Sequence, residues 1–189
     1  MNREGKGSEA SKNGMRKLSM DDLNRKTTEQ FKQAAKIPIV ILLDNVRSMN
    51  NIGSVFRTAD AFLLQAIYLC GVTATPPHRE IQKTALGATD TVSWKHFATT
   101  VEAIQELKKH GFTIYGVEQV ESSIMLDKVK PTNPKIALVF GNEINGVSQE
   151  ALDICDACIE IPQYGTKHSI NLAVSVGIVI WEIAGKLKH

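Results

Sequence analysis

Three polar segments of the sequence carry side chains capable of chemistry, and each follows a run of apolar residues. The segments are residues 44–59, 141–148 and 161–175. Their candidate side chains are Asn51, Arg57, Glu143, Ser169 and Asn171. An arginine stays protonated at physiological pH, a carboxylate accepts protons or hydrogen bonds, and amide and hydroxyl groups do both. The set therefore combines a fixed positive charge, a carboxylate and neutral polar groups.

Each candidate side chain also has an ordinary structural explanation. Arg57 can pair with Asp60 on the surface of a helix. The Gly and Asn residues around Glu143 suit a plain turn, and Ser169 can cap the last helix. Taken one at a time the segments are weak signals, so their meaning depends on where the fold places them.

Apolar patterns predict the elements that position these segments. Unbroken runs of Ile, Val and Leu are typical of strands buried on both faces, and helical spacing is typical of the segments between them. The expected strands are residues 39–43, 66–70, 112–117, 136–140 and 157–161. The expected helices are residues 52–63, 99–111, 148–154 and 171–187, and a short N-terminal helix over residues 20–36 that begins near Ser19 or Asp21. This alternation favours an α/β fold with a mostly parallel sheet covered by helices on both faces.

Ligands of such sheets bind beyond the carboxyl ends of the strands, which is where the three polar segments begin. A carboxylate directly after a buried strand, as Glu143 is, lies at the expected crevice. Gly141 stands at the end of the same strand, where backbone can approach a ligand closely. The residues therefore predict a ligand site at this edge of the sheet.

Charge divides the chain into two parts. Residues 1–36 carry nine Lys or Arg against five Asp or Glu, a net charge of +4, and the remaining residues carry −2. We expect a basic, partly flexible N-terminal arm over 1–36, with residues 1–19 flexible, and one folded domain over 37–189. Such an arm can bind a polyanion by neutralising phosphates, or can serve as a solubilising tail.

Several classes of protein are disfavoured by the sequence. The longest apolar run, Leu172–Trp181, is too short to span a membrane, and no signal peptide precedes the domain, so a cytoplasmic location is expected. Cys155 and Cys158 have the spacing of metal ligands but no second pair, so we predict thiols and no metal. The 141–146 segment has the glycines of a phosphate loop, but Val147 replaces its lysine.

Taken together, three patterns in order closely resemble the SpoU/TrmH family of RNA 2′-O-ribose methyltransferases, within the SPOUT superfamily. The patterns are Asn51-x-Gly53-x-x-x-Arg57-Thr58-Ala59, Val139-Phe140-Gly141-Asn142-Glu143-x-x-Gly146-Val147-Ser148 and Ile161-Pro162-x-x-Gly165-x-x-x-Ser169-Ile170-Asn171. The resemblance covers about residues 37–187. It implies a SPOUT fold with a deep C-terminal trefoil knot, S-adenosylmethionine as the cofactor, and a homodimer whose site draws on both chains.

The resemblance also implies roles for single residues. Arg57 matches the catalytic arginine and Asn51 the asparagine that helps to position it, while Glu143, Ser169 and Asn171 match the polar residues of the other two motifs. The matching cofactor-binding positions are Val117, Gly141, Ile161, Gln163 and Ile170. Departures from the family pattern, Gln163 and Leu172-Ala173 in the third motif, are expected to tune the cofactor wall.

Arg57 is proposed as the base in the family, but a guanidinium holds its proton far above neutral pH. We therefore expect Arg57 to stabilise the developing alkoxide. The expected substrate is tRNA, because compact relatives often act on tRNA. The alternatives are the same reaction on ribosomal RNA and a non-catalytic RNA-binding or assembly factor; the intact residue set argues against the last. RNA recognition is expected from the basic arm, the dimer surface or a partner.

Overall fold

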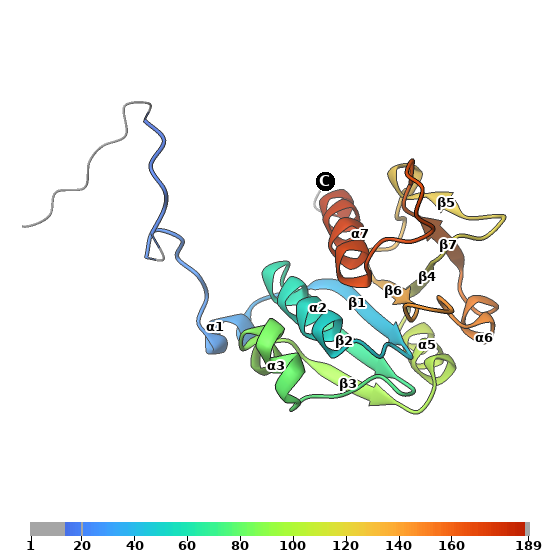
Figure 1. Cartoon of the computed structure of the whole chain (residues 1–189). Helices are drawn as coiled ribbons and strands as arrows, with labels where there is room; N and C mark the ends of the chain where they lie inside the picture. The colour runs from blue at the N-terminus through green and yellow to red at the C-terminus, as the bar shows by residue number, and fades with distance from the viewer. Residues whose placement is uncertain (1–13, 20, 188–189) are drawn as a thin grey trace, which may run out of the picture.

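A computed structural model describes residues 14–19 and 21–187 and contains one parallel sheet with helices on both faces (Figure 1). The strands are β1 (Ile37–Asp44), β2 (Leu64–Cys70), β3 (Trp94–Phe97), β4 (Thr113–Val117), β5 (Ile124–Met125), β6 (Ile136–Phe140) and β7 (Ala157–Glu160). The helices are α1 (Thr28–Gln33), α2 (Met49–Ala61), α3 (Arg79–Ala85), α4 (Ala88–Thr91), α5 (Thr100–Lys109), α6 (Gln149–Leu152) and α7 (Leu172–Leu187), with a 3-10 turn η1 (Leu126–Lys128). The sheet order is β3-β2-β1-β6-β4-β7-β5, and every pair is parallel.

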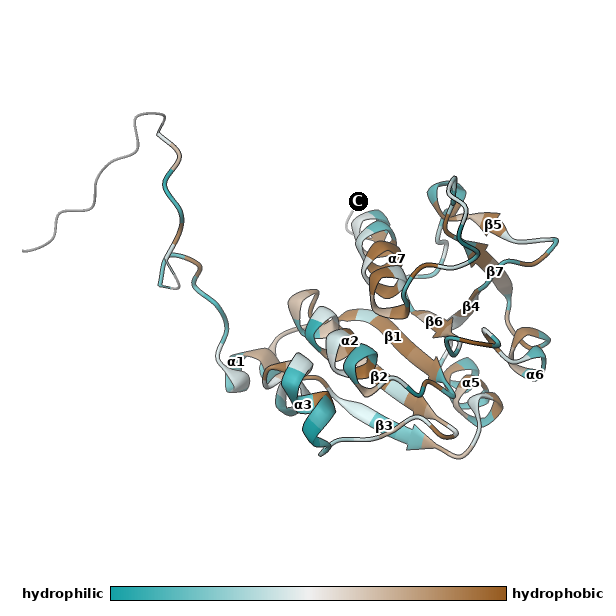
Figure 2. Cartoon of the chain, in the orientation of Figure 1, coloured by the Kyte–Doolittle hydropathy of each residue, from teal (hydrophilic) through white to brown (hydrophobic). Residues whose placement is uncertain are grey.

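Alternate residues of β1 face two different hydrophobic clusters. Ile39, Ile41 and Leu43 pack with apolar residues of α2, α3 and α7, whereas Val40 and Leu42 pack with those of α5 and α6. Figure 2 shows β1 as an apolar strand at the centre of the molecule and α3 as largely hydrophilic. The sequence-based prediction of a mostly parallel sheet covered on both faces is confirmed.

The N-terminal helix is shorter than expected from the sequence. Instead of extending through residues 20–36, α1 begins after Thr27, whose hydroxyl accepts from the Gln30 backbone N–H while the Gln30 side chain accepts from the Thr27 N–H. Phe31 is 4% exposed and joins the main core, so this part of the arm is attached to the sheet domain. Most of the segment expected to be flexible, residues 1–13 of 1–19, lies outside the described residues.

Five elements were not expected from the sequence: α3, α4, β3, β5 and the 3-10 turn η1. Each is short, and β3 exposes Lys95 and His96, so no apolar run marks it. The other predicted helices are confirmed. Thr99 caps α5 by accepting from the Glu102 N–H at 3.2 Å. Within the described ranges, no helix has both the length and the apolar character needed to cross a membrane.

Gly53 brings α2 into close contact with α3. A Cβ atom at this position would lie 2.1 Å from the Thr84 hydroxyl and 2.3 Å from the Ile81 carbonyl oxygen. We expect Gly53→Ala to lower the free energy of unfolding by about 1–3 kcal/mol, because the helices must separate. Denaturant titration measures the change. Gly185→Ala in α7 is the matched control, because nothing lies within 4 Å of the added atom, and equal stability of the two variants would contradict the expectation.

Candidate active site

The carboxyl ends of β1, β6, β4 and β7 lie side by side at one edge of the sheet. A cavity of about 570 Å³ opens at this edge. Its lining includes all five residues expected to bind a cofactor, Val117, Gly141, Ile161, Gln163 and Ile170. It also includes Glu143, Ser169 and Asn171. The fold thus brings the second and third polar segments together around one cavity.

Asn51 connects all three polar segments. Its amide nitrogen donates to Glu143 Oε1 at 3.0 Å, and its amide oxygen accepts from Asn171 Nδ2 at 3.2 Å. Asn51 itself is fixed at the start of α2, where its backbone N–H donates to the capping Ser48 hydroxyl at 3.3 Å. Ser48 is therefore the cap of this helix. Asn51 and Asn171, which are 120 positions apart in the chain, are thus hydrogen-bonded to each other.

The Glu143 carboxylate is held in its ionised form. Partial burial raises the pKa of this carboxyl. Hydrogen bonds from its own backbone N–H, the Asn51 side chain and the backbone of Arg47 and Ser48 lower the pKa by more than burial raises it. The net pKa therefore lies below the usual value. Hydrogen bonds to the charged form of a carboxylate have this effect. Glu143 is consequently a fixed negative charge near neutral pH, suited to orienting donors and cations and poorly suited to donating a proton.

Asn171 caps α7, and Ser169 does not. Asn171 Oδ1 accepts from the backbone N–H groups of Ala173 at 2.9 Å and Val174 at 3.4 Å, directly before the first turn of the helix. The cap leaves the Asn171 amide nitrogen free to donate to Asn51. Ser169 lines the cavity instead, so the simple structural explanation of this serine does not hold.

The 141–148 loop folds back so tightly that only glycine fits at its start. A Cβ atom at Gly141 would lie 1.8 Å from the Gly146 carbonyl carbon and 2.0 Å from the Val147 nitrogen. The turn between them is fixed by Asn142, whose side-chain oxygen accepts from the backbone of Ile144 and Asn145 at 2.9 and 2.8 Å. Gly141 therefore permits contact between backbone segments, which shapes the wall that a ligand would meet.

Two carboxylates that hold this loop were not singled out from the sequence. Asp44, 1% exposed at the end of β1, accepts from the Ser148 backbone N–H at 2.7 Å and the Thr100 hydroxyl at 2.5 Å. Glu118, directly after β4, accepts from the Val147 backbone N–H at 3.0 Å and lines the cavity. The signal was available, because each is a carboxylate at the end of a buried strand, as Glu143 is.

Arg57 stands apart from the other candidates. It is exposed and lines a second cavity of about 380 Å³ together with Thr28, Asp60 and Asp90. Within residues 14–19 and 21–187, its guanidinium makes no hydrogen bond or ion pair, so the Arg57–Asp60 pair is not formed. A single chain thus assembles four of the five candidate catalytic residues and leaves the arginine elsewhere, with its donors available.

The cysteines of the Cys155–Cys158 spacing lie beside β4, away from the cavity lining. Cys155 Sγ lies 3.2 Å from the Ala151 carbonyl oxygen, and burial raises the pKa of the Cys155 thiol to about 12. A thiol with so high a pKa is a poor nucleophile and metal ligand at neutral pH. The described residues contain no cluster of three or more His, Cys, Asp or Glu able to hold a metal ion.

Comparison with known proteins links this geometry to RNA modification. Residues 38–181 match the family described as SpoU rRNA Methylase. The chain is 30% identical over 145 residues to the 23S rRNA (guanosine-2'-O-)-methyltransferase RlmB of Neisseria meningitidis, covering 77% of this chain. It is 29% identical over 161 residues to the tRNA (guanosine(18)-2'-O)-methyltransferase of Thermus thermophilus, covering 85% of this chain and 81% of that protein.

A solved structure shares both fold and sequence with the chain. The AdoMet-bound rRNA methyltransferase from Sinorhizobium meliloti superposes with a TM-score of 0.73 and 27% identity, covering 82% of this chain and 58% of that one. The chain spans only 57% of the length of the Neisseria meningitidis relative. Similarity therefore concerns the sheet domain that carries the cavity.

Proposed function

The chain belongs to the SpoU rRNA methylase family, and we propose that it transfers a methyl group from S-adenosylmethionine to a ribose 2′-hydroxyl in RNA. The observation that carries this proposal is the Asn51 side chain, which joins Glu143 to Asn171 at the cavity. The three family motifs thereby meet at one place. We propose with it the knotted C-terminal arrangement that the family implies.

The cavity suits the proposed cofactor. Its volume of about 570 Å³ lies within the range of small-molecule sites. Gly141, Ile161, Gln163 and Ile170 would hold the cofactor largely through backbone groups, and Val117 also lines the cavity. Glu118, Glu143 and Glu160 add carboxylates to the lining, which suits a ligand that carries positive charge. S-adenosylmethionine, when bound, supplies a methyl group attached to a positively charged sulfur.

The remaining chemistry falls to side chains that orient the ribose and manage the charge on its oxygen. Transfer requires alignment of the attacking oxygen, and the 2′-hydroxyl must lose its proton. We assign Arg57 to the developing alkoxide, because a preorganised guanidinium stabilises negative charge without giving up its own proton. Asn51, Glu143, Ser169 and Asn171 position the reacting groups at the cavity.

The position of Arg57 supports a site shared between two chains of a homodimer. Within one chain, Arg57 lines a different cavity from the one proposed to hold the cofactor. Helix α7 exposes three apolar side chains on one face, Val174 at 52%, Ile178 at 38% and Trp181 at 72%. Residues at this spacing form a stripe, and a stripe of this kind suits a contact with a second copy. We propose that the partner brings its arginine to the cavity.

We propose tRNA as the substrate and the cytoplasm as the location. The tRNA-modifying relative of Thermus thermophilus is matched over 81% of its length, compared with 57% for the rRNA-modifying relative of Neisseria meningitidis. Ribosomal RNA is the second candidate, because the latter relative has higher identity to the chain. The complete residue set disfavours a non-catalytic assembly factor.

Nucleoside mass spectrometry tests this function. The purified chain is incubated with methyl-labelled S-adenosylmethionine and either unmodified bulk tRNA or unmodified ribosomal RNA, and the nucleosides are then separated. The expected product is a labelled 2′-O-methylnucleoside in tRNA. Label in a base, or no label in either RNA, would contradict the proposed reaction, and label only in ribosomal RNA would replace the proposed substrate.

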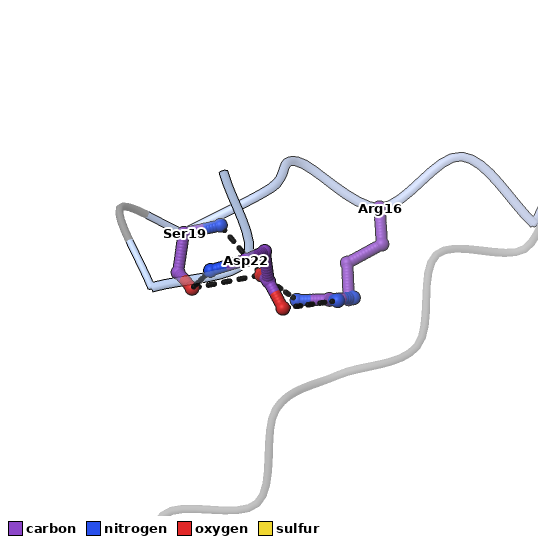
Figure 3. A network of polar contacts seen from close by, with 3 residues as sticks. All are labelled: Arg16, Ser19 and Asp22. Carbon is purple, nitrogen blue, oxygen red and sulfur yellow. Dashed lines mark hydrogen bonds and ion pairs between the residues drawn. The ribbon is translucent and has the colours of Figure 1, made fainter. Parts of the chain in front are cut away.

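The N-terminal arm is proposed to grip the RNA. Arg16 donates to both carboxylate oxygens of Asp22 at 2.9 and 3.2 Å, and Ser19 donates to the same carboxylate through its N–H and hydroxyl (Figure 3). These bonds, the Arg16 bond first, lower the pKa of Asp22 to about 2. Lys17, Arg25 and Lys26 are exposed, and no ion pair within the described residues involves them. They are therefore available to phosphates.

Deletion of residues 1–26 is expected to weaken tRNA binding and to leave cofactor affinity unchanged. The deletion retains α1 with its cap at Thr27, so Phe31 stays in the core. The slope of log Kd against log salt concentration should fall by about 0.7–0.9 for each lost phosphate contact. Filter binding over a salt series measures this slope. A full-length variant with Lys17, Arg25 and Lys26 changed to Ala separates charge from chain length, and an unchanged slope in both would refute the role.

A further inference from the structure

The loop between β7 and α7 carries a tyrosine, Tyr164, that is almost fully exposed to solvent. The Tyr164 side chain is 96% exposed, and no described residue forms a hydrogen bond or ring contact with it. Its neighbour Gln163 and the later residue His168 both line the cofactor cavity. Tyr164 is therefore an exposed aromatic residue on the loop that forms one wall of the cavity, between two residues of the lining.

Ile144 belongs to the 141–148 loop, which lines the same cavity. It lines the cavity although it is 81% exposed. Hydrogen bonds fix the turn that carries Ile144. Asn142 Oδ1 accepts from the backbone of Ile144 and Asn145, and Asn142 and Gly146 exchange backbone hydrogen bonds at 3.1 Å. Both loops that form the cavity thus present an apolar side chain to solvent. Neither side chain contributes to the core.

We propose that Tyr164 stacks on the base of the nucleotide whose ribose is methylated, with Ile144 contacting that base from the other loop. This inference rests on the proposed function. A ribose that reaches the cavity carries its base directly attached, so the base must lie at the rim. Proteins hold unpaired RNA bases by stacking them on aromatic side chains. Stacking tolerates every base, so this site recognises an unpaired nucleotide and does not read its identity.

RNA binding without methyl transfer tests the stacking role. The probe is a single-stranded RNA that contains 2-aminopurine, whose fluorescence is quenched when the base stacks, and S-adenosylhomocysteine occupies the cofactor site. We expect wild-type protein to quench the probe. Tyr164→Ala should abolish the quenching and weaken binding about 5- to 150-fold, the range for loss of one stacked base. Tyr164→Phe keeps the ring and should retain both properties.

Two controls fix the interpretation. Cofactor affinity, measured by calorimetry with S-adenosylhomocysteine, should be the same in all variants, because Tyr164 is not part of the cavity lining. Val72→Ala removes an apolar side chain that is 65% exposed outside the cavity lining and should leave RNA binding unchanged. Quenching by Tyr164→Ala equal to wild type would overturn the proposal. A shift of Tyr164→Ala from dimer to monomer would also overturn it and assign the ring to an interface between copies.

The outcome separates this proposal from the proposed reaction. A chain that quenches the probe through Tyr164 but methylates no RNA contradicts the reaction and leaves the stacking site standing. A chain that methylates tRNA with Tyr164→Ala at the wild-type kcat and KM retains the reaction and loses the stacking site. If stacking positions the ribose, Tyr164→Ala raises KM for RNA more than it lowers kcat.

Discussion

Arg57→Lys should reduce kcat for methyl transfer at least about 100-fold, since loss of one preorganised donor to a developing oxyanion has this effect. The substitution keeps a positive charge but removes the planar fork of donors. Arg57 is exposed and forms no bond within residues 14–19 and 21–187, so the fold does not depend on it. Cofactor affinity should be unchanged, because the proposed contact of Arg57 is with the ribose oxygen and not with the cofactor.

Single-turnover methylation of tRNA measures the rate, and calorimetry measures cofactor affinity. Arg79→Lys, an exposed arginine at the start of α3, is the matched control and should keep full activity. A near-normal rate for Arg57→Lys would show that charge alone suffices and would contradict the role of the guanidinium. An equal loss in both variants would indicate weaker RNA attraction in general.

Mixed dimers test whether Arg57 acts on the partner's cavity. Arg57→Lys keeps an intact cofactor cavity, and a variant impaired at Gly141 keeps an intact arginine. If the site is shared, a dimer containing one chain of each kind has one complete site, and mixing two weak variants restores activity. If each chain is self-sufficient, mixing restores nothing, and the proposed sharing fails.

The central strands could be predicted because they are buried on both faces. β1 and β6 are continuous apolar runs, and no other element of this length gives that pattern between polar loops. β3 and β5 lie at the two edges of the sheet and escaped prediction. An edge strand has less to bury, and β5 has only two residues, both exposed. Apolar patterning reports burial, so it fails where burial is incomplete.

The residues of the site were predictable from motifs, but their contacts were not. Asn51 and Asn171 lie 120 residues apart, and only the meeting of α2 with the start of α7 brings them within hydrogen-bond distance. The separation of Arg57 from the cavity, in contrast, follows from helical geometry. Arg57 is six residues after Asn51 on α2, and a period of about 3.6 residues places the two on different sides of the helix.

The missed carboxylates show the limit of choosing loops one by one. The residues that follow β1, β6 and β7 were selected, whereas the residue that follows β4 was not. Glu118 lies there, between the ends of β6 and β7, and holds the loop that contains Glu143. Asp44 was within a selected segment but was assigned no role, although it too binds this loop. Carboxylates at successive strand ends shape one loop, and only the sheet order reveals this.

Gly141→Ala should abolish the site more completely than loss of any polar side chain, because it acts on the backbone. The added methyl group would lie 1.8 Å from the Gly146 carbonyl carbon and 2.1 Å from its oxygen, and neither atom belongs to a flexible side chain. The ends of the loop must move apart, which breaks the hydrogen bonds between Asn142 and Gly146. Displacing reacting groups by about 1 Å can cost about 100-fold in rate.

The expected result is at least about a 100-fold loss of kcat/KM, following that displacement argument, together with weaker binding of S-adenosylhomocysteine. Gly165→Ala is the matched control in the third motif: nothing lies within 4 Å of its added methyl group. It should bind the cofactor analogue as wild type does. Calorimetry measures both affinities, and circular dichroism confirms that both variants are folded. Full affinity in a folded Gly141→Ala protein would mean that the tight return of the 141–148 loop is not what shapes the cavity wall.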